Sequence, residues 1–153
     1  KALGQIKHGW HFGQHGTPNA FGLVGNEANA ARAGRRPLSS MTPSFVIGPE
    51  RVLVIGTPGG SRIITAVLHT ILNVVDYGMN LQEAVDAPRF HQQWLPEATN
   101  LERFAISPDT EKILLGMGHK FGNPQPADPL FALNGQFTAV IGKHVPMPAA
   151  LPY

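Results

Sequence analysis

The sequence predicts a layered α+β fold, and two patterns of apolar residues carry this prediction. The runs 45–47 and 52–55 are apolar and mostly β-branched, and the turn residues Gly48-Pro49-Glu50 separate them. Two such runs around a turn are typical of a β-hairpin. Farther along the chain, apolar residues recur at helical spacing, at positions 63, 64, 67, 68, 71, 72 and 75. A hairpin and an apolar-striped helix in one chain pack as layers around a shared core.

Capping residues predict where the first two helices begin and end. Ser61 is a suitable N-cap for a helix over 61–77, and Gly78 stands where a C′ glycine is expected. The run Asn80-Leu81-Gln82-Glu83 resembles a capping box. It predicts a short second helix, which Pro88 must end because proline cannot continue a helix.

The rest of the chain adds one helix and one strand to this core. A third helix is predicted from Ser107-Pro108 to about Gly118, and a last strand over 136–141. Because the hairpin strands lack clean alternation of apolar and polar residues, we expect both faces of their sheet to be covered. We interpret the chain as a single partial domain over 1–153, made of a loop-rich first segment (1–38), a core of strands and helices (39–118) and a divergent C-terminal tail (119–153).

Composition excludes several classes of function. Charged residues make up only 14% of the chain, which suggests that part of its surface is covered by something other than water. The net charge of +2 is too small and too scattered for a nucleic-acid footprint. The absence of cysteine excludes disulfides, thiolate metal sites and a cysteine nucleophile, and we expect neither a metal nor a cofactor. No apolar run approaches the roughly 18 residues of a membrane helix.

Two short motifs offer groups that bind anions. Gly59-Gly60 lies between the second strand and the first helix, where backbone N–H groups at a helix start can bind an anion or a developing oxyanion. The alternative is a tight, well-capped connection, and the glycine spacing fits neither a phosphate P-loop nor a dinucleotide fingerprint. Ser39-Ser40 offers two hydroxyls that can donate to a carboxylate, or it is a solvated loop. Farther on, His91 is either a catalytic histidine or part of a packed corner. We favour the packed corner, in which Arg89 stacks or pairs and His91 makes a structural hydrogen bond.

Four longer motifs together resemble the small subunit of γ-glutamyltranspeptidases. They occupy residues 19–30, 35–43, 56–65 and 83–96, and include Pro-Leu-Ser-Ser-Met at 37–41 and Gly-Thr-Pro-Gly-Gly-Ser at 56–61. The resemblance runs from about Phe12 to about Gly118. It implies the N-terminal nucleophile hydrolase fold, a four-layer αββα sandwich made by two subunits that are cut autocatalytically from one precursor.

The resemblance also implies roles for individual residues. Ser39 and Ser40 would hold the α-carboxylate of the γ-glutamyl group, and the amides of Gly59 and Gly60 would form the oxyanion hole. The family's nucleophile is a threonine at the N-terminus of the small subunit, whose α-amino group acts as base. This sequence begins with Lys1 and its threonines are internal, so we expect the nucleophile upstream.

His11 stands at the position of the family's amino-binding aspartate. An imidazole cannot replace a carboxylate as the partner of an ammonium group, so the family role does not carry over to His11. Either the N-terminal segment is divergent, or these first residues are not family sequence.

The leading hypothesis is that the chain is the C-terminal part of a γ-glutamyltranspeptidase-like small subunit. The intact enzyme would transfer the γ-glutamyl group of glutathione or related amides to an amino acid, a peptide or water through an acyl-enzyme. Its partner would be the large subunit of the same precursor, and its location periplasmic, secreted or extracellular-facing. Two alternatives remain: a related acylase acting on glutaryl or poly-γ-glutamate substrates, and a catalytically dead homologue that serves as a binding or structural subunit.

Overall fold

The computed structural model describes residues 18, 24, 25, 32–34, 36, 39–122 and 138–143. Helices and antiparallel strands both occur in this part of the chain, which is the α+β class that the sequence predicts. The elements are β1 (Ser44–Ile47), β2 (Arg51–Gly56), the 3₁₀ turn η2 (Gly60–Arg62), α2 (Ile63–Val75), α3 (Leu81–Asp86), β3 (Phe90–His91), β4 (Asn100–Leu101), α4 (Pro108–Gly116) and β5 (Thr138–Lys143).

The main sheet has the strand order β1-β2-β5, and all of its pairings are antiparallel. The predicted hairpin is confirmed: Ile47 lies opposite Val52, and the Gly48 N–H donates to the Arg51 carbonyl at 2.8 Å. The predicted last strand also exists, two residues later than expected. It pairs with the other edge of β2 and places Lys143 opposite Arg51.

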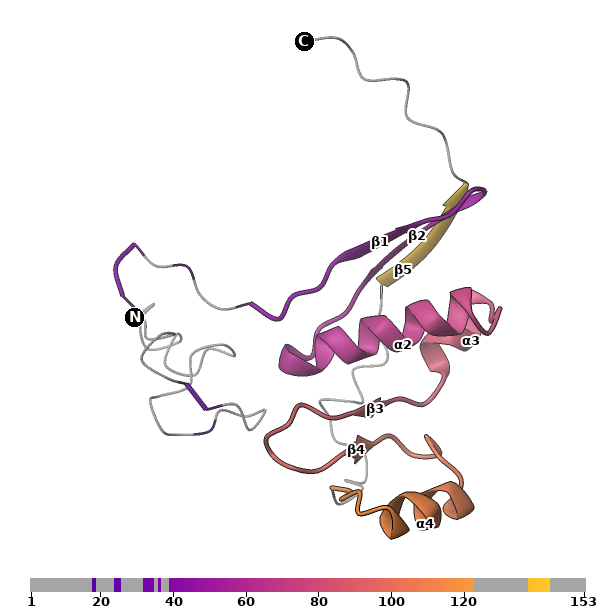
Figure 1. Ribbon diagram of the computed structural model, residues 1–153. Coiled ribbons are helices and arrows are strands. Elements are labelled where there is room, and N and C mark those ends of the chain that lie inside the picture. Colours follow the sequence, from indigo (N-terminus) through magenta and orange to yellow (C-terminus); the bar gives the residue numbers. More distant parts are fainter. Residues whose placement is uncertain are drawn as a thin grey trace.

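One face of this sheet packs on α2, as Figure 1 shows. Ile55 forms a buried cluster with Ile63 and Val67 from the helix. On the opposite face Phe45 and Ile47 are 69% and 67% exposed. Among the residues described here, the expectation that both faces are covered therefore holds for one face only. Buried and exposed side chains do alternate along the strands. The exposed positions are apolar as well, so the sequence shows no alternation of apolar and polar residues.

The start of α2 differs from the prediction, whereas its end agrees with it. Ser61 is not an N-cap: it lies inside η2, and its hydroxyl donates to the Gln93 Oε1 instead of accepting from a helix N–H. At the other end Gly78 has a φ of +65°, and the Met79 N–H donates to the Asn73 carbonyl at 2.9 Å. The bond spans six residues, one more than a Schellman bond, and the cap residue is Asp76. The left-handed glycine therefore ends the helical run as predicted, but two residues beyond the cap.

The two other predicted helices begin at the expected caps. The side chains and backbone N–H groups of Asn80 and Glu83 hydrogen-bond reciprocally, both at 3.0 Å, which is a complete capping box. The Ser107 Oγ accepts from the Thr110 N–H at 3.2 Å and caps α4.

A second, two-stranded sheet lies between α3 and α4 in the chain, and the sequence did not indicate it. Its strands β3 and β4 have two residues each, too few to show a period of two. Figure 1 shows β3 and β4 on the side of α2 that faces away from the main sheet, so this helix is packed between the two sheets. Within the residues described, no helix is long and apolar enough to span a bilayer.

Candidate active site

The turn between β2 and α2 adopts a backbone that glycine allows most easily. Gly59 has a φ of +139° and Gly60 a φ of +59°, and both residues are buried. A Cβ added at Gly59 would meet the Ile63 side chain at an ordinary 3.8 Å. The backbone conformation, rather than a lack of space, therefore explains the glycine at position 59.

The hydrogen bonds of this turn fix the direction of its N–H groups. The Gly59 carbonyl accepts from the Arg62 N–H at 3.1 Å and so points into the helical run. Because a trans peptide is flat, the Gly60 N–H points the opposite way, out of the helix start. The first N–H groups of a helix have no partner within it and lie at the positive end of its dipole. The turn thus presents at least one N–H to an anion.

The serine pair lies just before β1. The Ser39 Oγ accepts from the Met41 N–H at 3.1 Å, and its own proton stays available to a carboxylate. Figure 1 shows that the chain before β1 and the turn after β2 leave the sheet at the same end. Strand pairing joins Ser44 to Ile55, and the same register continued would bring Ser40 level with Gly59. The shared pocket of serines and glycines stays a prediction, because the pairing stops before these residues.

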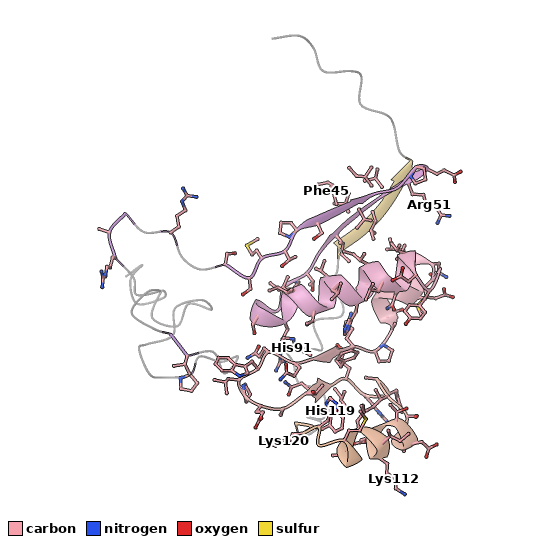
Figure 2. All side chains as sticks on the ribbon, in the orientation of Figure 1. Phe45, Arg51, His91, Lys112, His119 and Lys120 are labelled. Carbon is pink, nitrogen blue, oxygen red and sulfur yellow. The ribbon has the colours of Figure 1, made fainter. Side chains whose placement is uncertain are left out.

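A polar cluster joins the start of the helical run to β3 and the segment after it, and its members are Ser61, Thr65, His91 and Gln93. Figure 2 labels His91, which lies below α2 in that view. His91 is only 3% exposed. Its Nδ1 lies 2.8 Å from the Thr65 Oγ1 and its Nε2 2.8 Å from the Gln93 Oε1. The same Gln93 oxygen accepts from the Ser61 hydroxyl at 2.6 Å.

The protonation of this cluster follows from its acceptors. Burial lowers the pKa of His91, and the nearby Arg62 charge lowers it further, against the Gln93 hydrogen bond. The Gln93 amide N–H donates to the Leu95 carbonyl at 3.0 Å, which leaves Oε1 as the acceptor that faces His91. The lowered pKa keeps His91 neutral at neutral pH, and the proton on its Nε2 donates to the Gln93 Oε1. The Thr65 hydroxyl, which lies next to the His91 Nδ1, also donates to the Arg62 carbonyl at 3.1 Å, so its one proton is divided between these two acceptors.

Arg89 forms the second part of the predicted packed corner. It is 3% exposed, and its Nε and Nη2 both donate to the Glu102 Oε1, at 3.1 and 3.0 Å. Its Nη1 also donates to the Val85 carbonyl at 2.9 Å, which ties the two-stranded sheet to α3. The expected pairing of Arg89 and the structural hydrogen bonds of His91 are both confirmed.

Other features lie apart from this site. His11 lies outside the described residues, and nothing in the described part gathers three or more potential metal ligands. A cavity of about 470 Å³ lies at the opposite end of the main sheet, between the hairpin turn and the C-terminus of α2, where Arg51, Leu53, Val74 and Gly78 are among its lining residues.

Comparison with known proteins identifies the family. The family model of γ-glutamyltranspeptidase matches residues 7–141. The glutathione hydrolase proenzyme of Pseudomonas sp. (strain A14) is 65% identical over 119 residues, which are 77% of this chain and 21% of that protein. The glutathione hydrolase proenzyme of Escherichia coli (strain K12) is 53% identical over 106 residues, 69% of this chain and 18% of that protein.

A solved structure agrees with these relatives. The T380A mutant of Helicobacter pylori γ-glutamyltranspeptidase superposes with a TM-score of 0.69 and 40% identity, over 88% of this chain and 76% of that one. The fold thus places the chain among the N-terminal nucleophile hydrolases. Within that class, it belongs to the γ-glutamyltranspeptidase family. The chain spans about a fifth of the length of the two proenzymes named above.

Proposed function

We propose that this chain is part of an enzyme that transfers or hydrolyses the γ-glutamyl group of glutathione and related amides. The observation that carries the proposal is the Gly59–Gly60 turn, whose Gly60 N–H points out of the start of a helical run. Membership of the γ-glutamyltranspeptidase family supports the choice of substrate, as do the names of the two glutathione hydrolase proenzymes.

In this proposal the chain stabilises charge and orients the substrate. A hydroxyl nucleophile on a preceding segment attacks the amide carbonyl, and the oxygen that becomes negative is held by the N–H groups of Gly59 and Gly60. The hydroxyls of Ser39 and Ser40 donate to the substrate's α-carboxylate. Departure of the amine leaves an ester, which water or an acceptor amine then cleaves.

We also propose that the large subunit of the same precursor is the partner. Phe45, Ile47 and Val54 project from the sheet face that α2 does not cover, and Figure 2 shows Phe45 on that side. An apolar sheet face needs a second layer. A further sheet packed there would complete the expected four-layer sandwich. The periplasmic, secreted or extracellular-facing location stays a prediction.

The test is an assay of the processed two-subunit enzyme with a chromogenic γ-glutamyl anilide and, separately, with the glutaryl anilide. We expect release of the aniline from the γ-glutamyl compound and little from the glutaryl compound, which keeps the carboxylate but lacks the α-amino group. Equal or faster glutaryl cleavage would favour the related acylase, and an inactive assembled enzyme would favour the dead homologue.

A further inference from the structure

We propose that the polar cluster of Ser61, Thr65, His91 and Gln93 positions the Gly59–Gly60 turn, so that His91 and Gln93 are positioning residues for the oxyanion hole. This inference rests on the proposed function, and it assigns a role to groups that touch neither the substrate nor the nucleophile.

The turn needs support from outside because glycine adopts many backbone conformations. A side-chain cap normally fixes the start of a helix, yet neither η2 nor α2 has a side-chain cap at its N-terminus. An oxyanion donor must nevertheless be in place before the charge develops, since any reorganisation at that moment raises the barrier.

The polar cluster supplies this support through side-chain hydrogen bonds. Ser61 follows Gly60 directly in the chain, and its hydroxyl is bound to the Gln93 Oε1 at 2.6 Å. One helical turn later, Thr65 contacts the Nδ1 of His91 at 2.8 Å. Two points on the first turn of the helical run are thus attached to β3 and to the segment that follows it, although 32 residues separate Ser61 from Gln93.

The cluster is also built to be rigid. The Gln93 Oε1 receives two donors, Ser61 and His91, and the Gln93 amide group is held by the Leu95 carbonyl. His91 therefore acts as a spacer of fixed length between Thr65 and Gln93. In the part of the chain that the structure describes, no buried side-chain nitrogen or oxygen lacks a hydrogen-bond partner. A fully satisfied buried network of this kind specifies one arrangement.

The experiment uses the processed two-subunit enzyme and two pairs of variants. Gln93→Leu removes the shared acceptor, and its control is Gln92→Leu at the exposed neighbouring residue, whose Oε1 only accepts from the Trp94 N–H. Ser61→Ala removes the hydroxyl next to the turn, and Ser61→Thr keeps a hydroxyl there. The measurements are the single-turnover rate of acylation by a γ-glutamyl anilide, the KM, and the inhibition constants of two ligands.

These ligands separate the two parts of the site. A boronic-acid analogue of the γ-glutamyl group becomes tetrahedral on the nucleophile and places an oxygen in the oxyanion hole, whereas glutamate binds through its carboxylate at the serines. We expect Gln93→Leu and Ser61→Ala to slow acylation and weaken the boronate about 10–100-fold, less than the roughly 10²–10³-fold loss for deleting one donor. The KM and the glutamate inhibition constant should change less than about twofold, and Ser61→Thr should recover most of the rate.

Other outcomes overturn the inference. An acylation rate in Gln93→Leu equal to that of the wild type would mean that the turn keeps its conformation without the cluster. An equal loss of glutamate and boronate binding, or an equal effect of Gln92→Leu, would mean that the cluster only supports folding. If the wild-type enzyme itself releases no aniline, the proposed function fails and this inference fails with it. An active wild-type enzyme with unaffected variants refutes this inference alone.

Discussion

Two left-handed glycines, Gly60 and Gly78, stand at opposite ends of the same helical run and allow a matched comparison. Both have a φ near +60°, at +59° and +65°. A left-handed residue with a side chain costs about 1–2 kcal/mol, and a β-branched one is a genuine outlier. Gly60→Val should lower the kcat of the processed enzyme about 10²-fold by moving the oxyanion donors. Gly78→Val should lower the Tm and leave the kcat unchanged, and similar kcat values for the two variants would contradict the role of the turn.

The serine pair predicts a different kinetic effect. Replacing Ser39 and Ser40 together by alanine should raise the KM for a γ-glutamyl anilide, because each hydrogen bond to a charged group contributes about 1.5–3 kcal/mol. The control is Ser44→Ala, whose hydroxyl donates to the Thr42 carbonyl within the same segment. An unchanged KM in the double variant, or an equal rise in the control, would remove the serines from the carboxylate site.

At the residue scale, the sequence was most informative where a residue acts through its neighbours in the chain. Asn80 and Ser107 each cap a helix by accepting from a backbone N–H three residues farther along the chain, so their roles follow from spacing. Ser61 was expected to do the same, but its partner Gln93 is 32 residues distant. A hydrogen bond of this kind depends on tertiary packing, and spacing in one sequence holds no signal for it.

The two-stranded sheet of β3 and β4 depends on one buried ion pair. Arg89→Met would leave the Glu102 carboxylate, only 11% exposed, without its cation. Breaking one partner of a buried pair costs about 3–5 kcal/mol, so we expect a clear loss of stability in denaturant unfolding of the processed enzyme. Lys120→Met is the control, because its pair with Glu97 is exposed on both sides, and it should change nothing measurable. A small effect of Arg89→Met would show that the sheet is held by other contacts.

The histidines beside this sheet predict a dependence on pH. Burial is the main reason that the pKa values of His69 and His91 lie below the ordinary value of 6.5. Above pH 6.5 these histidines are neutral in both the folded and the unfolded state. Below pH 6.5 the unfolded chain takes up protons that the folded chain does not, because the folded pKa values are lower. The free energy of unfolding therefore falls until the pH passes the folded pKa values. The Tm should therefore drop as the pH is lowered from about 7 to 5. His91→Gln should reduce this slope, and an unchanged slope would mean that His91 is not held neutral.

At the scale of elements, the hairpin and the starts of α3 and α4 were predicted because local turn and capping residues determine them, whereas the start of α2 was not. The strands β3 and β4 were not, since each has only two residues and is held in place by Arg89 and His91. The position of the glycine turn at a helix start left two interpretations open, an anion site and a tight connection, and the family resemblance favoured the anion site. Its support by the polar cluster follows only from the fold.

We expect the stability of the whole subunit to depend on its proposed partner, the large subunit. The buried apolar side chains in the described part of the chain are few, namely Leu53, Ile55, Ile63, Val67 and Ala84. We therefore expect no cooperative thermal transition from the isolated chain, and a cooperative one after assembly with the large subunit. Phe45→Asp should prevent co-purification of the two subunits, whereas Met117→Asp, a similarly exposed apolar position on the α4 side, should not. A stable, well-behaved monomer would contradict this view.

The turn between β1 and β2 has a consequence for how this chain finds its register. Because both faces of the hairpin carry apolar side chains, slipping the pairing by one residue would exchange one apolar face for the other, and hydrophobicity alone would hardly oppose it. The register must then be set by the Gly48–Arg51 closure and by β5 on the far side of β2. A single residue inserted in this turn would present Phe45 to the helix and Val46 to the opposite face. The turn thus decides which apolar face packs on α2 and which one is left for the proposed partner subunit.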